Sequence, residues 1–266
     1  MAQQPLQELA AMRRPWTREQ LVIAMNLYSR LTFGQLHARN PLVIQVAARL
    51  HRTPGSLAMK LCNLASFDPV LAARGIAGLK AASQLDRQVW DAFQKDWMGM
   101  GSESEVQFRR LMNEPLITSP ESEEWLLREG PTETERTMCQ RLGQDFFRRT
   151  VLVSYGTRCC ITGNPIAPLL TASHIVGWAD DVKERLNPRN GLCLAKTHDA
   201  AFDRHLITLD ERFRVVLSKS IRDHFASETI SVNFKPFEGR PIELPQRFAP
   251  DPKLVDRHRE IFSRLE

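Results

Sequence analysis

Residues 171–203, TASHIVGWADDVKERLNPRNGLCLAKTHDAAFD, gather two of the chain's seven histidines and four aspartates into one short stretch. A neutral imidazole such as that of His174 can take a proton from water near pH 7. Asp199 and Asp203 are four residues apart, so on a helix they share one face and can offer oxygens to a single cation. The stretch is therefore either a metal-dependent catalytic centre or a polar loop rich in titratable groups.

Strands and a helix must hold these groups in place. The sequence predicts a β-hairpin in which residues 160–162 form one arm and residues 169–176 form the returning arm, with His174 near its end. A short helix is expected from residue 198 to about 204, and a second hairpin turns at residues 210–212. The expected order around the stretch is strand, turn, strand, loop and helix.

Residues 15–98 are predicted to form a helical module. Thr17 and Gln20 occupy capping-box positions of a first helix, and Asn40 can cap a second. The turn RTPGS then leads into a third helix, an arrangement similar to a helix-turn-helix unit. In that unit Arg52 and Lys60 would face DNA, whereas the alternative is a module that only packs or dimerises.

The net charge of +5 is unevenly distributed along the chain. Residues 1–98 hold 12 basic against 6 acidic side chains, and the chain from residue 136 onward holds 21 against 16. Between them, residues 99–135 hold 3 against 9 and are rich in Gly, Ser and Pro, so we expect an acidic linker there. Residues 1–14 are expected to be a flexible N-terminus. Two positive units favour a polyanionic partner, although a modest positive charge also serves solubility alone.

Targeting and cysteine patterns indicate a cytoplasmic protein without a membrane partner. The N-terminal residues lack the apolar centre of a secretory signal, and no run of about 18 apolar residues occurs. Five cysteines, an odd number, do not resemble a disulfide framework in a chain of 266 residues. We expect them to be reduced thiols.

The ordered motifs C-x-x-T-G, SHI-x-x-W, R-x-N-P-x-NGL-x-L, HD-x-AFD and LIT, over about residues 158–220, resemble the HNH endonucleases, and most closely their bacterial restriction-type branch. The resemblance implies an α+β chain: a helical N-terminal module followed by a ββα-metal nuclease domain at residues 136–266. It also implies double-stranded DNA as substrate. His174 would be the general base and Asn190 the residue that ties the loop together through amide hydrogen bonds.

The resemblance implies one divalent cation per active site, and oxygen ligands favour Mg²⁺ or Mn²⁺. Where many members carry a metal-binding histidine, this chain has Asp199, with His198 before it; we rank Asp199 first, then Asp203 and His198. Ser173 stands where other members carry a metal ligand. The alternative for Asp199 is a helix-dipole role, and for Asp203 a surface charge.

Many HNH proteins also hold a structural zinc between two C-x-x-C pairs. Here Cys159 and Cys193 each lack the second cysteine of the pair, and two thiolates do not complete a tetrahedral site. We therefore expect no structural zinc. Arg185 and Arg189 are candidates for neutralising a phosphate, and their alternative is a solvated loop charge.

These features favour a restriction or defence nuclease whose target is selected by the N-terminal module. The alternatives are a nonspecific or regulated nuclease, and a DNA-binding regulator that does not cleave. One active centre cuts one strand, so a double-strand break would need a homodimer or two successive events.

Overall fold

The computed structural model describes residues 15–75, 82–116 and 131–266; the expected flexible N-terminus, 1–14, lies outside these ranges. The chain divides into two compact units, Met1–Phe146 and Phe147–Glu266. No helix in the described ranges is both long and apolar enough to cross a membrane.

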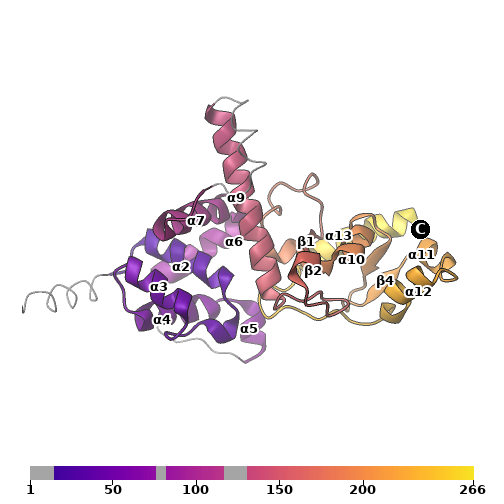
Figure 1. The fold of residues 1–266 in the computed structure, drawn as a ribbon, viewed down its shortest axis with the longest axis horizontal. Coiled ribbons are helices and arrows are strands. Elements are labelled where there is room, and N and C mark those ends of the chain that lie inside the picture. The colour runs from indigo at the N-terminus through magenta and orange to yellow at the C-terminus, as the bar shows by residue number, and fades with distance from the viewer. Residues whose placement is uncertain (1–14, 76–81, 117–130) are drawn as a thin grey trace, which may run out of the picture. The chain divides into compact units, whose positions relative to one another are not determined.

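The N-terminal unit is built from helices, as expected (Figure 1). Its described elements are α2 (Arg18–Arg30), η1 (Phe33–Gln35), α3 (Pro41–Arg49), α4 (Pro54–Ala65), α5 (Pro69–Ala73), α6 (Gln84–Lys95) and α7 (Trp97–Met112). The Thr17–Gln20 capping box is present at the start of α2, and the Asn40 side chain caps α3. Apolar side chains of α2, α4, α6 and α7 form the core, among them Tyr28, Leu61, Phe93 and Phe108.

Helix α7 corrects the expectation that an acidic linker begins at residue 99. It packs against α2 and continues to Met112, and the Glu105 carboxylate is buried there against Arg30 and Arg109. A glutamate that composition counts as a solvated charge is instead neutralised inside the unit. Of the rest of the expected linker, residues 117–130 lie outside the described ranges.

Helix α9 (Pro131–Ser154) crosses the division between the two units. Composition places the start of the C-terminal unit at residue 136, whereas the compact unit begins at Phe147, within α9. The charge changes near residue 136, but the helix continues without a break. From Phe147 onward, α9 contributes side chains to the C-terminal unit.

The C-terminal unit contains a ββα element, which confirms the expected α+β class. Antiparallel strands β1 (Leu170–His174) and β2 (Gly191–Ala195) are followed by α10 (Lys196–Asp203). The remaining elements are η2 (Ala167–Leu169), η3 (Pro188–Asn190), β3 (Ile207–Leu209), β4 (Val215–Leu217), α11 (Lys219–Asp223), α12 (Glu228–Phe234), η4 (Lys235–Phe237) and α13 (Pro252–Leu265). β3 pairs with β4 around the second hairpin turn, as predicted.

The first hairpin pairs differently from the prediction. Residues 160–162 form no strand; they lie in a turn in which Gly163 N donates to the Cys159 carbonyl at 2.8 Å. β1 instead pairs with β2, so that His174 lies opposite Gly191. Alternating polarity identifies strands but not their partners. The true pairing brings the end of the SHI motif next to the NGL motif.

Candidate active site

His174 lies at the end of β1 with its ring held on three sides. The ring stacks on Phe147 of α9, with centroids 4.2 Å apart and an interplanar angle of 9°, and the Trp178 ring meets it edge-on at 5.7 Å. Its Nε2 lies 2.8 Å from the carbonyl oxygen of Arg185. Because a carbonyl only accepts, Nε2 carries the hydrogen, and the neutral ring keeps its lone pair on Nδ1. Nδ1 is thus the basic atom of the site.

Burial lowers the pKa of His174 below the ordinary histidine value. The Arg185 carbonyl and the charges of Asp199 and Asp203 act in the opposite direction and do not overcome it. At pH 7 the imidazole is therefore neutral and able to accept a proton.

Helix α9 is a part of this site that the sequence did not indicate. A Cβ added to Gly191 would collide with Val151 and touch Phe147, so the glycine is required by the close approach of α9. The same Phe147 stacks on His174. The only sequence signal was the aromatic pair in the otherwise polar stretch GQDFFRR of this helix.

Asn190 ties together the loop that follows β1, as the resemblance implied. Its side chain is fully buried; Oδ1 accepts from Val176 N at 2.8 Å, while Nδ2 donates to the carbonyls of Val176 at 3.0 Å and Glu184 at 3.1 Å. The loop that these bonds close also carries the Arg185 carbonyl, which fixes the His174 tautomer. Asn190 is therefore a positioning residue.

The Asn190→Ala variant is expected to lose about 3 kcal/mol of unfolding free energy, because the buried N–H and carbonyl of Val176 and the part-buried carbonyl of Glu184 lose their partner. Urea unfolding of the full chain measures the loss. Asn164→Ala is the matched control: its Oδ1 accepts only from Ile166 N in an exposed turn, so a loss of about 1 kcal/mol or less is expected. Equal losses for the two variants would contradict the role of Asn190 in holding the loop after β1.

Asp199 lies in the first turn of helix α10 and Asp203 is its last residue, and their spacing of four places them on one face of the helix. Asp199 is half-buried and Asp203 is exposed. Within the described residues, no three histidine, cysteine, aspartate or glutamate side chains are arranged to hold one metal ion. Two carboxylates nevertheless suit Mg²⁺ or Mn²⁺, because such ions keep several waters and complete their shell with substrate oxygens. The donor set fits the cation that the resemblance implied.

His198 does not point into the site, which corrects its candidacy as a metal ligand. Its side chain is 3% exposed, Nε2 lies 2.9 Å from the Asn233 carbonyl, and the ring packs against Phe234 and Phe237. His198 therefore joins α10 to α12. The sequence could not separate His198 from Asp199, because adjacent helical residues differ only in the direction they face.

Ser173 is buried in β1 beside His174. Neighbouring residues of a strand face opposite sides of the sheet, which argues against Ser173 as a ligand beside the His174 ring. Its role as a metal ligand stays a prediction.

Arg185 and Arg189 remain partly accessible in the loop and beside it. Arg185 Nε donates to the Trp178 carbonyl at 2.6 Å, and its guanidinium lies over the Trp178 ring. Arg189 pairs with Asp251 at 3.4 Å and is 37% exposed. Both residues lie in the segment between β1 and β2, and both are partly exposed.

Arg52 and Lys60, the cations expected to face DNA, are bound within the N-terminal unit. Arg52 is buried, donates to Pro15 O at 2.7 Å and Gln20 Oε1 at 2.8 Å, and stacks on Trp16. Lys60 pairs with Asp86 at 2.8 Å, and its side chain is 13% exposed. Both cations stabilise the helical unit, so their position in a helix-turn-helix-like segment did not indicate a DNA contact.

Three cysteines of the C-terminal unit are buried free thiols: Cys159, Cys160 and Cys193. Burial raises the pKa of Cys193 to about 12 and that of Cys160 well above its usual range. Cys160 N donates to the Cys193 carbonyl at 2.8 Å and so attaches the preceding turn to β2. As buried free thiols, all three side chains act as small packing groups.

Residues 159–210 match the protein family described as HNH endonuclease. This range holds β1, β2, α10 and the polar side chains of the site, so the chain carries an HNH endonuclease domain. That domain makes the chain a phosphodiester hydrolase, a nuclease with DNA as the implied substrate. A search of curated proteins gave no match to the chain.

Proposed function

We propose that the protein is a metal-dependent endonuclease of double-stranded DNA, acting in restriction or defence, with the N-terminal unit selecting the target. The observation that carries the nuclease activity is the fixed tautomer of His174 inside the HNH endonuclease domain: its Nε2 lies 2.8 Å from the Arg185 carbonyl oxygen, which leaves the Nδ1 lone pair as the proton acceptor. The division into two units supports a separate target-selecting part. Since Arg52 and Lys60 are bound internally, selection rests on other surface residues of that unit.

In the proposed reaction His174 Nδ1 takes a proton from the water that attacks the phosphodiester. Phe147 and the Arg185 carbonyl keep the ring in place during this transfer, and Asn190 keeps the carbonyl in place. Asp199 and Asp203 would hold the cation, which supplies charge stabilisation for the phosphorane and the departing 3′-oxygen. The exposed parts of Arg185 and Arg189 offer positive charge to a phosphate.

Both strands are cut if two copies act as a homodimer or if one copy acts twice. A nonspecific or regulated nuclease would use the same centre, and the two functions differ only in the base contacts that select a target. The presence of His174, Asn190 and Asp199 disfavours a regulator that binds DNA without cleaving it.

Plasmid cleavage with and without DNA modification tests the proposal. The wild type is expected to cut with Mg²⁺ or Mn²⁺ and to stop in EDTA, and Asp199→Asn is expected to need about 10–100-fold more metal for the same rate, because a carboxylate ligand is lost. Asp223→Asn, an exposed aspartate at the end of α11, is the matched control and should behave as the wild type.

The pattern of cutting then separates the functions. Cleavage that depends on sequence or modification supports restriction, whereas equal cleavage of every plasmid supports a nonspecific nuclease. Cleavage that persists in EDTA would contradict the metal requirement. DNA binding without any cleavage would favour the regulator instead.

A further inference from the structure

A pocket of about 130 Å³ lies between the ββα element and α13, all within the C-terminal unit. Its lining includes His174 and Asp203 of the catalytic centre, Asp180 and His205, and Arg257, His258 and Ile261. Three of these residues belong to α13, which lies beyond the residues matched to the HNH family. The pocket therefore joins the rim of the catalytic centre to a helix with no assigned role.

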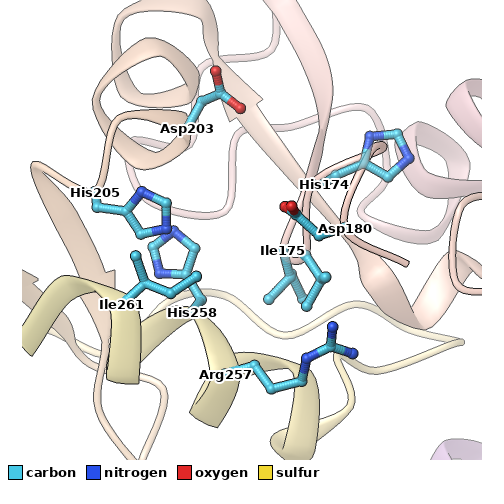
Figure 2. Close-up of a pocket in the computed structure, with 10 residues that line it drawn as sticks. His174, Ile175, Asp180, Asp203, His205, Arg257, His258 and Ile261 are labelled. Carbon is cyan, nitrogen blue, oxygen red and sulfur yellow. The ribbon is translucent and has the colours of Figure 1, made fainter. Parts of the chain in front are cut away.

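Two sides of the pocket differ in character (Figure 2). One side carries the stacked rings of His205 and His258, with centroids 4.4 Å apart, and the side chain of Ile261. His205 takes a left-handed conformation, φ 54°, directly after the last turn of α10, and His258 bonds to Thr208 and to the Phe202 carbonyl. This wall is therefore fixed from both α10 and α13.

The other side carries the charged groups. Arg257 and Asp180 lie on the side opposite the stacked rings, and Asp203 lies at the upper rim (Figure 2). The carboxylates of Asp180 and Asp203 by themselves repel an anion. Asp203 is, however, a candidate ligand of the catalytic cation, and a bound cation would offset its negative charge. An anion between that cation and Arg257 would meet positive charge from two directions.

Arg257 is oriented by its ion pair with Asp181, where Nη1 and Oδ2 are 2.8 Å apart. Its other nitrogens, Nε and Nη2, make no hydrogen bond to the described part of the chain, and its side chain is 43% exposed. An ion pair this exposed is weak, whereas guanidinium and phosphate form strong charge-assisted bonds. Arg257 can therefore bind a phosphate while Asp181 holds its orientation.

We propose that this pocket binds a backbone phosphate of the DNA strand beside the scissile phosphate, and that Arg257 is the residue that contacts it. The inference rests on the proposed function, because the catalytic centre at the rim sets where the scissile phosphate lies. The size agrees: a cavity of about 150 Å³ holds one benzene ring, so this pocket accepts a phosphate group but not a whole nucleotide.

Salt-dependent DNA binding and plasmid cleavage test the contact. Binding of a labelled DNA duplex is measured in the His174→Ala background, so that the DNA stays intact, with and without Arg257→Gln. Loss of one phosphate contact should reduce the slope of log K against log [salt] by about 0.9. With an intact His174, Arg257→Gln should reduce kcat/KM by about 10–100-fold.

Two variants control for charge and for folding. Arg264→Gln removes an exposed arginine from the same helix but outside the pocket, and it should change neither the slope nor cleavage. Asp181→Asn removes the ion pair but keeps the Arg257 charge, so the slope should remain that of the unsubstituted chain. A slope lowered equally by Asp181→Asn and Arg257→Gln would attribute the effect to the lost ion pair and overturn the inference.

The outcomes also separate this inference from the proposed function. If the wild type cleaves DNA and Arg257→Gln matches Arg264→Gln in both measurements, the phosphate contact is wrong and the nuclease stands. If no DNA is cleaved but Arg257→Gln alone lowers the slope, the contact between Arg257 and a DNA phosphate is supported and the nuclease activity is contradicted. If neither cleavage nor a change in slope is found, both are wrong.

Discussion

Replacement of His174 by alanine is expected to reduce the single-turnover rate of DNA cleavage by about 10²–10⁴-fold, the usual contribution of a general base. The structure gives the reason, since the ring is fixed by Phe147 and by the Arg185 carbonyl with Nδ1 left as the basic atom. DNA affinity should change little, because the imidazole is neutral. Quenched-flow cleavage of a labelled duplex measures the rate.

His224→Ala is the matched control for this variant. His224 is exposed, and its Nδ1 lies 2.7 Å from the Ser220 carbonyl, far along the chain from the catalytic loop. Its replacement should leave the cleavage rate unchanged. A His174→Ala protein that is folded and cleaves as fast as His224→Ala would exclude His174 as the base.

The same assignment sets the pH dependence of cleavage. The neutral ring is the active form, and burial lowers its pKa below the ordinary value of about 6.5. The cleavage rate should therefore rise with pH as His174 loses its proton, with a midpoint below about pH 6.5. At pH 7 the deprotonation of His174 should no longer limit the rate. A limb centred above that value would contradict the environment described for His174.

Glu105→Ala is expected to lower the unfolding free energy of the N-terminal unit by about 3–5 kcal/mol. The Glu105 side chain is fully buried; it accepts from Arg30 Nη2 at 3.0 Å, from Arg109 Nε at 2.8 Å and from Asn26 Nδ2 at 3.0 Å. Removing the carboxylate leaves two mostly buried guanidinium groups with less compensation. Hydrogen exchange of α2 and α7 in the full chain locates and measures the loss.

Glu103→Ala provides the comparison on the same helix. Its carboxylate pairs with Arg18 at 3.0 Å, but the two side chains are 37% and 47% exposed, so about 1 kcal/mol or less is expected. If both glutamates had the same effect, the buried charges would not hold α2 and α7 together.

Local patterns in the sequence were sufficient for the helical N-terminal unit and for the location of the HNH region. Capping signals located the starts of α2 and α3, and ordered motifs located His174 and Asn190. The direction in which a side chain faces was harder to predict: His198 is adjacent to Asp199 in the sequence, yet its ring is bonded to the Asn233 carbonyl of α12. One step along a helix or strand is enough to remove a side chain from a site.

Contacts between distant parts of the chain could not be read from the sequence. Phe147 comes from a helix before the motifs and Arg257 from a helix after them; the aromatic pair at Phe147 was the one signal, and it did not show which residue the ring contacts. Arg52 was misjudged for the related reason that its partners, Pro15 and Gln20, become neighbours only after folding. A basic residue in a turn reveals its charge but not whether that charge is already paired.

Helix α9 is part of the smallest fragment that can be expected to retain the nuclease site. Its Phe147 stacks on His174, and its side chains pack directly against Gly191. A fragment cut to residues 159–210 would keep the proton acceptor but lose the aromatic surface that supports it. Transplantation of the activity into another protein therefore has to begin within α9, upstream of the recognisable motifs.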